Sequence, residues 1–248
     1  MKRGLVLNTR SGILVAFSSL LLAACVQDPG RDSRHEGGFR PPVDLPAPDV
    51  LGLVVEFGRF DSATGRAGAF RLDATTRYAD KVFLEFNAVV NGPDGPKRLP
   101  TFEYRVDKDA VVRAPASGYV IHFEHQPETD DYEIGIARSL EDGRHGMVMV
   151  DHVRDIAVAK GDSVAAGQVI GKAGTWSGEL GRVELMVVEG DSAYCPLARM
   201  PDSLKEIHRA SIRDLMADWE TFKEDPAVYD EDAMPEPGCN DLAAGPDP

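Results

Sequence analysis

Two stretches decide the fold: VRAPASGYV at residues 112–120 and VAKGDSVAAGQVIGKAG at residues 158–174. Both join short β-prone runs through residues that tolerate turn dihedrals, such as Gly161-Asp162 and Ala166-Gly167-Gln168. The pattern predicts tight turns between short strands, each followed by apolar residues that enter the core. The residues predicted to face the core are Val158, Val164, Val169 and Ile170.

The same texture extends along the chain on both sides of these stretches. Turn signals at residues 91–96 and 141–143 separate the runs, and no long helical period occurs before residue 200. Regular short strands with such turns are typical of an all-β sandwich or barrel, so we predict a mainly β domain over residues 51–194. The predicted strands are Leu51–Phe57, Ala69–Leu72, Lys81–Val90, Phe102–Val106, Val111–Arg113, Gly118–His125, Tyr132–Ala137 and Met147–Val153.

Residues 195–248 differ from this domain and are predicted to hold one helix and an acidic tail. Ser203 and Glu206 have capping-box spacing, and Asp225-Pro226 ends the helical pattern. An apolar stripe at helical period indicates a helix that packs on the β domain, with a membrane or partner helix as the alternative. The stripe comprises Leu204, Ile207, Ser211, Ile212, Leu215, Met216, Trp219 and Phe222.

The N-terminus carries an export signal. Three basic residues precede the apolar run 13–22, which is too short to span a membrane and ends in Ala23-Ala24-Cys25. Leu22-Ala23-Ala24-Cys25 resembles the lipobox of bacterial lipoproteins. That resemblance implies a signal peptide over residues 1–24, removed before a lipidated Cys25 that anchors the protein to a membrane. The alternative is an ordinary secretory signal with a chance cysteine.

The segment after the cysteine is predicted to be a disordered tether. Residues 25–50 are rich in proline, glycine and charge, and His35 lies among them without an expected role. Val26 follows the cysteine, which by resemblance to Gram-negative lipoproteins favours the outer membrane. Loss of residues 1–24, with three basic and no acidic side chains, takes the net charge from −14 to −17. Such a charge excludes nucleic acid as a partner.

Two cysteines remain once Cys25 is lipidated: Cys195 and Cys239. In an oxidising envelope compartment an isolated pair favours a disulfide. The two thiols have no neighbouring cysteine or histidine with which to complete a zinc site. The sequence therefore predicts a bond that closes a loop of about 45 residues, stabilises the fold by up to roughly 4 kcal/mol, and ties the helix to the β domain.

The two deciding stretches resemble two families. One is the biotinyl or lipoyl carrier domain, which needs a modifiable lysine at a hairpin tip, and no lysine lies between Lys108 and Lys160. The other is the β-sheet core (the duplicated hybrid motif) of M23, or LytM-type, peptidoglycan metallopeptidases. Residues 114–120 are similar to the family's Ala-x-x-x-Gly-x-Val strand, residues 149–153 to its Tyr-x-His-Leu segment, and residues 181–188 to the strand that carries His-x-His.

The zinc chemistry of that family is where the sequence departs. Active members hold zinc through a His-xxx-Asp motif and the second histidine of His-x-His, and an open position holds the attacking water. Here Leu99 and Leu185 stand at the two histidine ligand positions, and only Glu103 could match the acidic one. His152 alone matches a family active-site histidine, and it is not a zinc ligand there. We expect no confident catalytic residue, no metal ligand and no cofactor.

Two further histidines lie close to the segment that resembles the family, at positions 122 and 125. His122 and His125 cannot share one face of a strand, because side chains alternate. One of them could join a cleft with His152, Glu103 and Glu184, which are the candidate binding residues. A surface strand that carries two histidines is the simpler interpretation.

Three functions remain open. The first is an envelope lipoprotein whose degenerate M23-like domain binds peptidoglycan or regulates a partner such as a cell-wall hydrolase; some LytM-type lipoproteins activate amidases, and this is an analogy. The second is a divergent zinc metallopeptidase acting on peptidoglycan cross-links. The third is a structural envelope protein. Loss of the histidine pair favours the first and third over the second.

Overall fold

The computed structural model describes residues 45–92, 95–141 and 146–245. The predicted signal peptide, Cys25 and most of the predicted tether, including His35, lie outside these residues. The described residues belong to one compact unit, Pro41–Pro248. Among them no helix has the length and apolar character that a membrane crossing requires.

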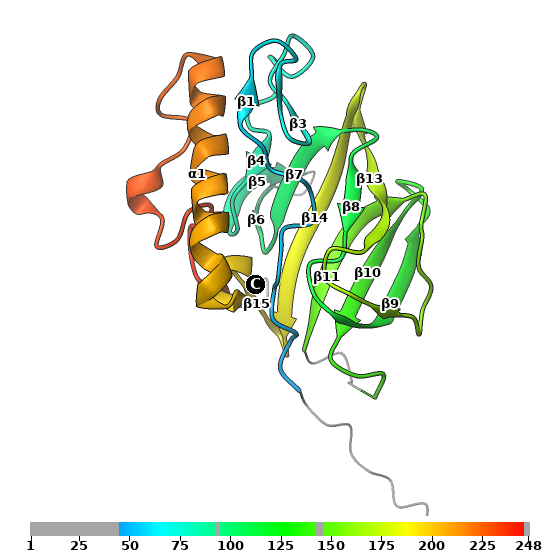
Figure 1. The fold of residues 1–248 in the computed structure, drawn as a ribbon. Coiled ribbons are helices and arrows are strands. Elements are labelled where there is room, and N and C mark those ends of the chain that lie inside the picture. Colours follow the sequence, from blue (N-terminus) through cyan, green and yellow to red (C-terminus); the bar gives the residue numbers. More distant parts are fainter. Residues whose placement is uncertain (1–44, 93–94, 142–145, 246–248) are drawn as a thin grey trace, which may run out of the picture. The chain divides into compact units, whose positions relative to one another are not determined.

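The chain is mainly β with one long C-terminal helix, as predicted (Figure 1). The strands are β1 (Phe60–Asp61), β2 (Arg66–Ala67), β3 (Phe70–Arg71), β4 (Phe83–Leu84), β5 (Ala88–Gly92), β6 (Gly95–Leu99), β7 (Phe102–Asp107), β8 (Val111–Arg113), β9 (Gly118–Gln126), β10 (Asp131–Ala137), β11 (Gly146–Arg154), β12 (Ser163–Val164), β13 (Val169–Ser177), β14 (Leu180–Glu189), β15 (Ser192–Tyr194) and β16 (Ala243–Ala244). The helices are α1 (Asp202–Lys223) and the short 3-10 helices η1 (Pro196–Arg199) and η2 (Glu231–Ala233).

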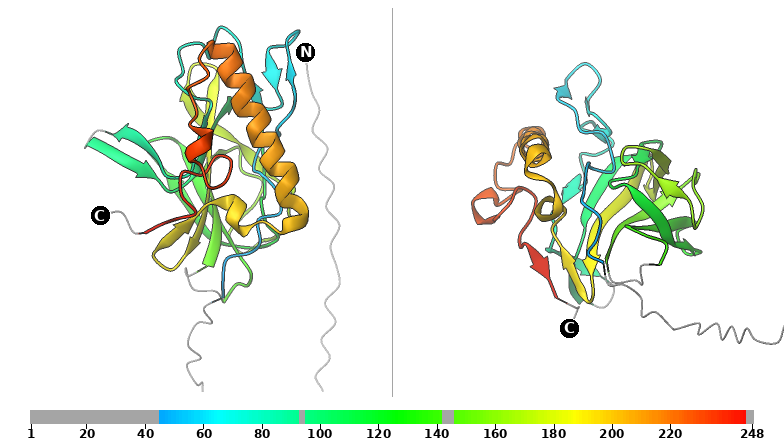
Figure 2. Two further views of the ribbon diagram at one scale, coloured as in Figure 1. Left: turned by 90° about the vertical axis from the view of Figure 1, so that its left-hand side faces the viewer. Right: turned by 60° about the horizontal axis from the view of Figure 1, so that its bottom comes forward.

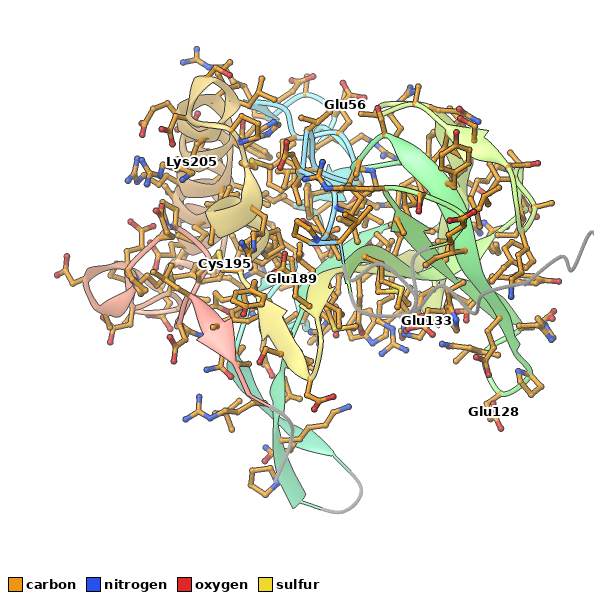
Figure 3. The ribbon with its side chains drawn as sticks, turned by 90° about the horizontal axis from the view of Figure 1, so that it is seen from below. Glu56, Glu128, Glu133, Glu189, Cys195 and Lys205 are labelled. Atoms are coloured by element: carbon orange, nitrogen blue, oxygen red, sulfur yellow. A yellow bond between two sulfur atoms is a disulfide. The ribbon has the colours of Figure 1, made fainter. Side chains whose placement is uncertain are left out.

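Strand β14 is the centre of the main sheet. One of its edges pairs first with β7 and then with β15, and the other pairs with β13 and β11. Strands β10 and β9 continue the sheet beyond β11, and β16 pairs with β15. The β5–β6 hairpin forms a two-stranded sheet of its own and projects beside β15 and β16 (Figures 2 and 3).

Helix α1 covers one face of the sheet on the side of β4 and β7, away from β9 and β10 (Figure 1). Four residues of the predicted stripe are buried, whereas Ile207 is 63% exposed, so that residue was placed wrongly. The Trp219 ring nitrogen donates to the carbonyl of Asp80 at 3.0 Å, which fixes the helix against the β4 side. The buried four are Ile212, Leu215, Met216 and Trp219.

The predicted disulfide is present between Cys195, at the end of β15, and Cys239 in the tail. Both residues are fully buried, and the backbone of Phe86 bridges to Cys239. Tyr229 adds a second attachment, because its hydroxyl donates to the carbonyl of Phe83 at 3.0 Å. The tail is thus fastened to the sheet on both sides of η2.

Several sequence predictions were wrong in detail. Residues 51–57 form no strand, and Lys81–Val90 divides into β4 and β5 around Asn87, whose φ of 64° breaks the run. The capping box fails because the helix begins at Asp202, so Ser203 lies inside the first turn and caps nothing. Val169 is 41% exposed, whereas the other three predicted core residues of the turn region are buried.

The segment 45–57 crosses the domain as an extended strap. Its contacts are single hydrogen bonds to several different elements rather than a continuous ladder. Arg138 donates to the carbonyls of Pro46 and Ala47, and Val50 donates to the carbonyl of Arg199 at 3.1 Å. Val50 and Val54 of the strap are fully buried. A run with a strand-like composition therefore forms no strand, because its hydrogen-bond partners lie on separate elements.

Candidate functional site

A bulge in β11 builds the site. Tyr132 of β10 opposes Val153, and Ile134 opposes Val150, so Asp151 and His152 share one place opposite Glu133. His152 takes a left-handed φ of 59°, and at this residue β11 changes partner from β14 to β13. A bulge redirects side chains that would otherwise alternate. Asp151 and His152 consequently contact one another beside the same pocket.

His152 is surrounded by carboxylates. Its Nδ1 lies 2.9 Å from Oδ2 of Asp131, which is fully buried, and this pair is a hydrogen bond. Its Nε2 lies 3.6 Å from Asp151 Oδ2 and 3.6 Å from Glu184 Oε1. These distances exceed hydrogen-bond length but suit ion pairs. Only 9% of the His152 side chain is exposed.

Neighbouring residues satisfy each of these carboxylates. Thr129 donates to Asp131 Oδ1 at 2.6 Å, Gln126 to Asp151 Oδ1 at 2.9 Å, and Thr101 to Glu184 Oε2 at 3.1 Å. Gly174 leaves the space that Asp131 fills, because a Cβ there would lie 2.6 Å from its Oδ2. The carboxylate cluster is therefore held in place before any ligand arrives.

The cluster favours a protonated His152. Burial by itself would lower the pKa of His152, but the carboxylates of Glu184 and Asp151 outweigh it and raise that pKa above its ordinary value. Burial works against ionisation of Glu184 as well, yet His152 and Arg182 lower its pKa. For Asp151 burial prevails and raises the pKa. The cluster therefore shifts His152 toward an imidazolium that faces Glu184.

The cluster opens into a pocket of about 280 Å³ on the outer face of the sheet. Its floor is partly apolar, and Met149 and Met186 belong to it. A second cavity of about 480 Å³ shares Pro100 and Met186 with the first and continues past Val188 to β16. The two together form a groove, hereafter the β14 groove, along the outer face of β14. Glu133, which lines its first part, is seen on the face of the sheet viewed from below in Figure 3.

The three candidate binding residues from the sequence meet only in part. His152 and Glu184 both line the pocket. Glu103 is the cross-strand neighbour of Glu184, but its Oε1 accepts from Arg105 at 2.9 Å and it does not line the cavity. Its acidic charge is already neutralised by that arginine.

The leucines assigned to histidine positions behave differently from one another. Leu99 borders the pocket, as the resemblance implied. Leu185 is fully buried in the core, so its assignment to a site position was wrong. Strand alternation puts Arg182, Glu184 and Met186 on the pocket side instead. The resemblance thus assigned the histidine positions of this strand one residue away from the side chains that face the pocket.

His122 and His125 do not join the cluster directly. His122 Nε2 lies 2.9 Å from Glu133 Oε2, and His125 Nε2 lies 3.0 Å from Asp130 Oδ1. They form two separate pairs, which agrees with the predicted alternation. His122 influences the pocket only through Glu133.

Sequence reasoning missed Asp131, Asp151 and Arg182. One signal was available for the last two, since charged residues interrupt otherwise apolar strand runs at these places. Asp131 closes a turn of acidic residues, where a fully buried carboxylate has no distinguishing mark. The bulge that unites Asp151 with His152 depends on three-dimensional pairing and leaves no local pattern.

The donor set does not fit the zinc centre that the resemblance implies. Asp131, Asp151 and His152 have ligand atoms within 4.8 Å of one another. The two aspartates, however, approach different nitrogens of the one imidazole, so the group offers a single imidazole and two carboxylates. The guanidinium of Arg182 stands 3.4 Å from His152 Nδ1 and 4.0 Å from Glu184 Oε1. It would repel a dication placed between those two residues. One free imidazole nitrogen also falls short of the nitrogen-rich set of a catalytic zinc.

Comparison with known proteins gives matches to solved structures alone: no family profile and no curated protein matches the chain. The catalytic domain of the M23 protein EnpA from Enterococcus faecalis is 20% identical, with 44% of this chain and 82% of that chain covered and a TM-score of 0.34. Csd3 from Helicobacter pylori is 12% identical over 75% of this chain and 46% of its own, at a TM-score of 0.38.

Lysostaphin from Staphylococcus simulans is also similar, with 17% identity over 51% of this chain and 49% of that chain and a TM-score of 0.36. The chain thus spans about half the length of the lysostaphin and Csd3 structures that it matches. EnpA is described as an M23 protein and lysostaphin as a peptidase. At such low identity they say nothing about activity, ligand or partner.

Proposed function

We propose that the protein is a lipid-anchored envelope protein whose catalytically degenerate M23-like domain binds peptide without cleaving it. The ligand is peptidoglycan or a partner that acts on the cell wall. The observation that carries the proposal is the guanidinium of Arg182 beside His152 and Glu184. A side-chain cation beside these two residues would repel a dication bound there, which supports binding without hydrolysis.

The pocket retains groups that suit peptide binding. A protonated His152 has an N–H at Nε2 that can donate to a peptide carbonyl at the pocket floor. The carboxylates around it are already held by Thr101, Gln126 and Thr129, so the ring is oriented in advance. Apolar side chains of the β14 groove supply area for the rest of the ligand. Binding can therefore persist where hydrolysis is lost.

Three measurements on the full chain purified in detergent test the proposal. Metal analysis should find substoichiometric zinc, and incubation with muropeptides and added zinc should give no cleavage. Pull-down with isolated sacculi should retain the protein. His152→Asn is the matched variant, because asparagine tolerates the left-handed backbone at this position, and it should weaken retention.

The divergent peptidase is the second candidate, and one observation favours it. Asp131 bonds to Nδ1 of His152, which is how a carboxylate orients a metal-binding imidazole. Stoichiometric zinc together with chelator-sensitive cleavage that His152→Asn abolishes would establish it and end the first proposal. If the protein binds no sacculi and cleaves nothing, the structural role is left.

The anchor is tested separately. Mass spectrometry of the membrane fraction should show Cys25 as an acylated N-terminus, with the outer membrane as the expected location. Cys25→Ser should release the protein from membranes. A mature chain that starts elsewhere would contradict the lipid anchor without touching the argument about the pocket.

A further inference from the structure

The β14 groove is lined by positively charged side chains that have no ion-pair partner among the described residues. Lys97 lines its first part and Arg98 its second, both on the projecting β5–β6 hairpin. Within the described residues, neither has a carboxylate at ion-pair distance, and Arg98 donates only to the carbonyl of Asn87 at 3.2 Å. In a chain of net charge −14, unpaired cations at the rim of a groove call for a ligand that supplies the acceptor.

Arg182 adds a third cation, on the floor. Its closest carboxylate oxygen, on Glu184, is 4.0 Å away. Its other close contact is His152 Nδ1, but that nitrogen has its proton directed to Asp131 and cannot accept a second hydrogen bond. The terminal nitrogens of Arg182 thus lack a good acceptor within the described structure, although they border the pocket.

The carboxylates of the pocket, by contrast, already have donors. Glu184 accepts from Thr101 and faces His152, Asp151 accepts from Gln126, and Glu133 faces His122 at 2.9 Å. In this first part of the groove each lining carboxylate already has at least one donor, whereas Lys97 and Arg182 lack a good acceptor. The second part also holds Asp191 and Asp241, so the unpaired cations that favour an anionic ligand lie in the first part. A ligand that contributes a carboxylate satisfies this arrangement, because charge-assisted hydrogen bonds to a guanidinium or ammonium are the stronger kind.

We propose that the β14 groove recognises a free carboxylate on a short cell-wall peptide, held between Lys97 and Arg182. The rest of the peptide lies over Met186 and Val188 toward β16. This inference rests on the proposed function and names the chemistry that its ligand must carry. The β5–β6 hairpin projects from the domain (Figures 2 and 3), and it lines the groove through Lys97 and Arg98.

The test compares two synthetic stem tetrapeptides, one with free carboxylates and one fully amidated. Calorimetry with the full chain in detergent should show that the free acid binds about tenfold or more tightly, the range expected for a hydrogen bond to a charged group. Lys97→Gln should remove most of this preference and leave the amidated peptide unaffected. Raised salt should weaken binding of the free acid, since Lys97 is exposed.

Lys160→Gln is the matched control, because Lys160 is an exposed lysine in the turn ahead of β12 and lies outside the groove. Equal binding of the two peptides, or equal losses in Lys97→Gln and Lys160→Gln, would overturn the inference. If sacculi are retained while both peptides bind alike, the proposed function stands and only the carboxylate is refuted. If neither sacculi nor peptides bind, the proposed function fails too. An unrelated acidic peptide that binds as tightly would assign the groove to a protein partner.

Discussion

The two faces of strand β14 differ in chemistry: one packs in the apolar core, and the other carries charged residues beside a pocket. On the inner face Val183, Leu185 and Val187 are fully buried in the core. On the outer face Arg182 and Glu184 form part of an ionic cluster beside a pocket. The inner face is specified by burial alone, which any apolar side chain of suitable volume supplies. The outer face depends on which charges meet, so it can change chemistry while the fold persists.

The largest effect is expected on the inner face. Leu185→Ala should lower the free energy of unfolding by about 3 kcal/mol, within a range of roughly 2–5, because the side chain leaves a cavity in a packed core. Denaturant unfolding followed by circular dichroism measures this loss. Met186→Ala on the outer face is the control and should cost clearly less. Equal losses would show that the two faces are packed alike.

The next effect concerns Asp131, the buried partner of His152. Asp131→Asn keeps the shape but removes the charge, and should cost about 1–3 kcal/mol of stability because the ring proton loses a charged acceptor. NMR titration of His152 should show its pKa falling toward or below the ordinary value. An unchanged titration would mean that Asp131 only fills space, and that the imidazolium owes its charge to Glu184 and Asp151 alone.

A pH series should separate the outer face from the inner one. The raised pKa of His152 stabilises the fold below its ordinary value of 6.5, and this contribution is lost as pH rises through the raised value. The lowered pKa of Glu184 contributes above its ordinary value of 4.5 and is lost as pH falls through the lowered one. Glu184→Gln should therefore cost about 1 kcal/mol near pH 6 and less near pH 9.

The same series on Leu185→Ala supplies the contrast. Its loss should stay nearly constant from pH 6 to pH 9, because no titrating group is removed. A pH-independent cost for Glu184→Gln would break the interpretation of the outer face as an ion-paired cluster.

The smallest change in stability is expected for Arg182. Arg182→Gln should alter the free energy of unfolding by no more than about 0.5 kcal/mol, because its one ion pair among the described residues is long and partly exposed. The zinc affinity of the variant protein should rise, however, because the positive charge that repels the ion is gone. Calorimetric zinc titration of the variant against the unmodified chain measures this. Unaltered affinity would mean that the guanidinium does not control metal binding.

The fold was largely predictable because its signals are local. Turn residues such as Gly161 and Gly167 do adopt positive φ values, and the strands between residues 102 and 154 lie within one residue of their predicted ends. The disulfide followed from counting cysteines. The failures arose where context overrides composition, as in the strap at residues 45–57, whose partners lie on separate elements, so that it forms no strand.

The site was predictable only for single residues. His152 and Glu184 were identified, because a polar residue within an apolar strand run is visible in sequence. Their grouping with Asp131 was not, since it depends on the bulge that changes the register of β11. The register of β14 also explains the error at Leu185. The family resemblance assigned this residue to the site, whereas its side chain lies on the core side of the strand. A shift of one residue exchanges the faces of a strand.

The strap has a mechanical consequence. Tension applied to the chain ahead of residue 45 is borne first by the hydrogen bonds of Arg138 to Pro46 and Ala47, and then by the Val50 contact to Arg199. Because these bonds reach separate elements, they are loaded one after another, and each can yield before the next. A pull from the N-terminal side would therefore peel the strap from the domain in steps, while the strand ladders of the sheet stay intact.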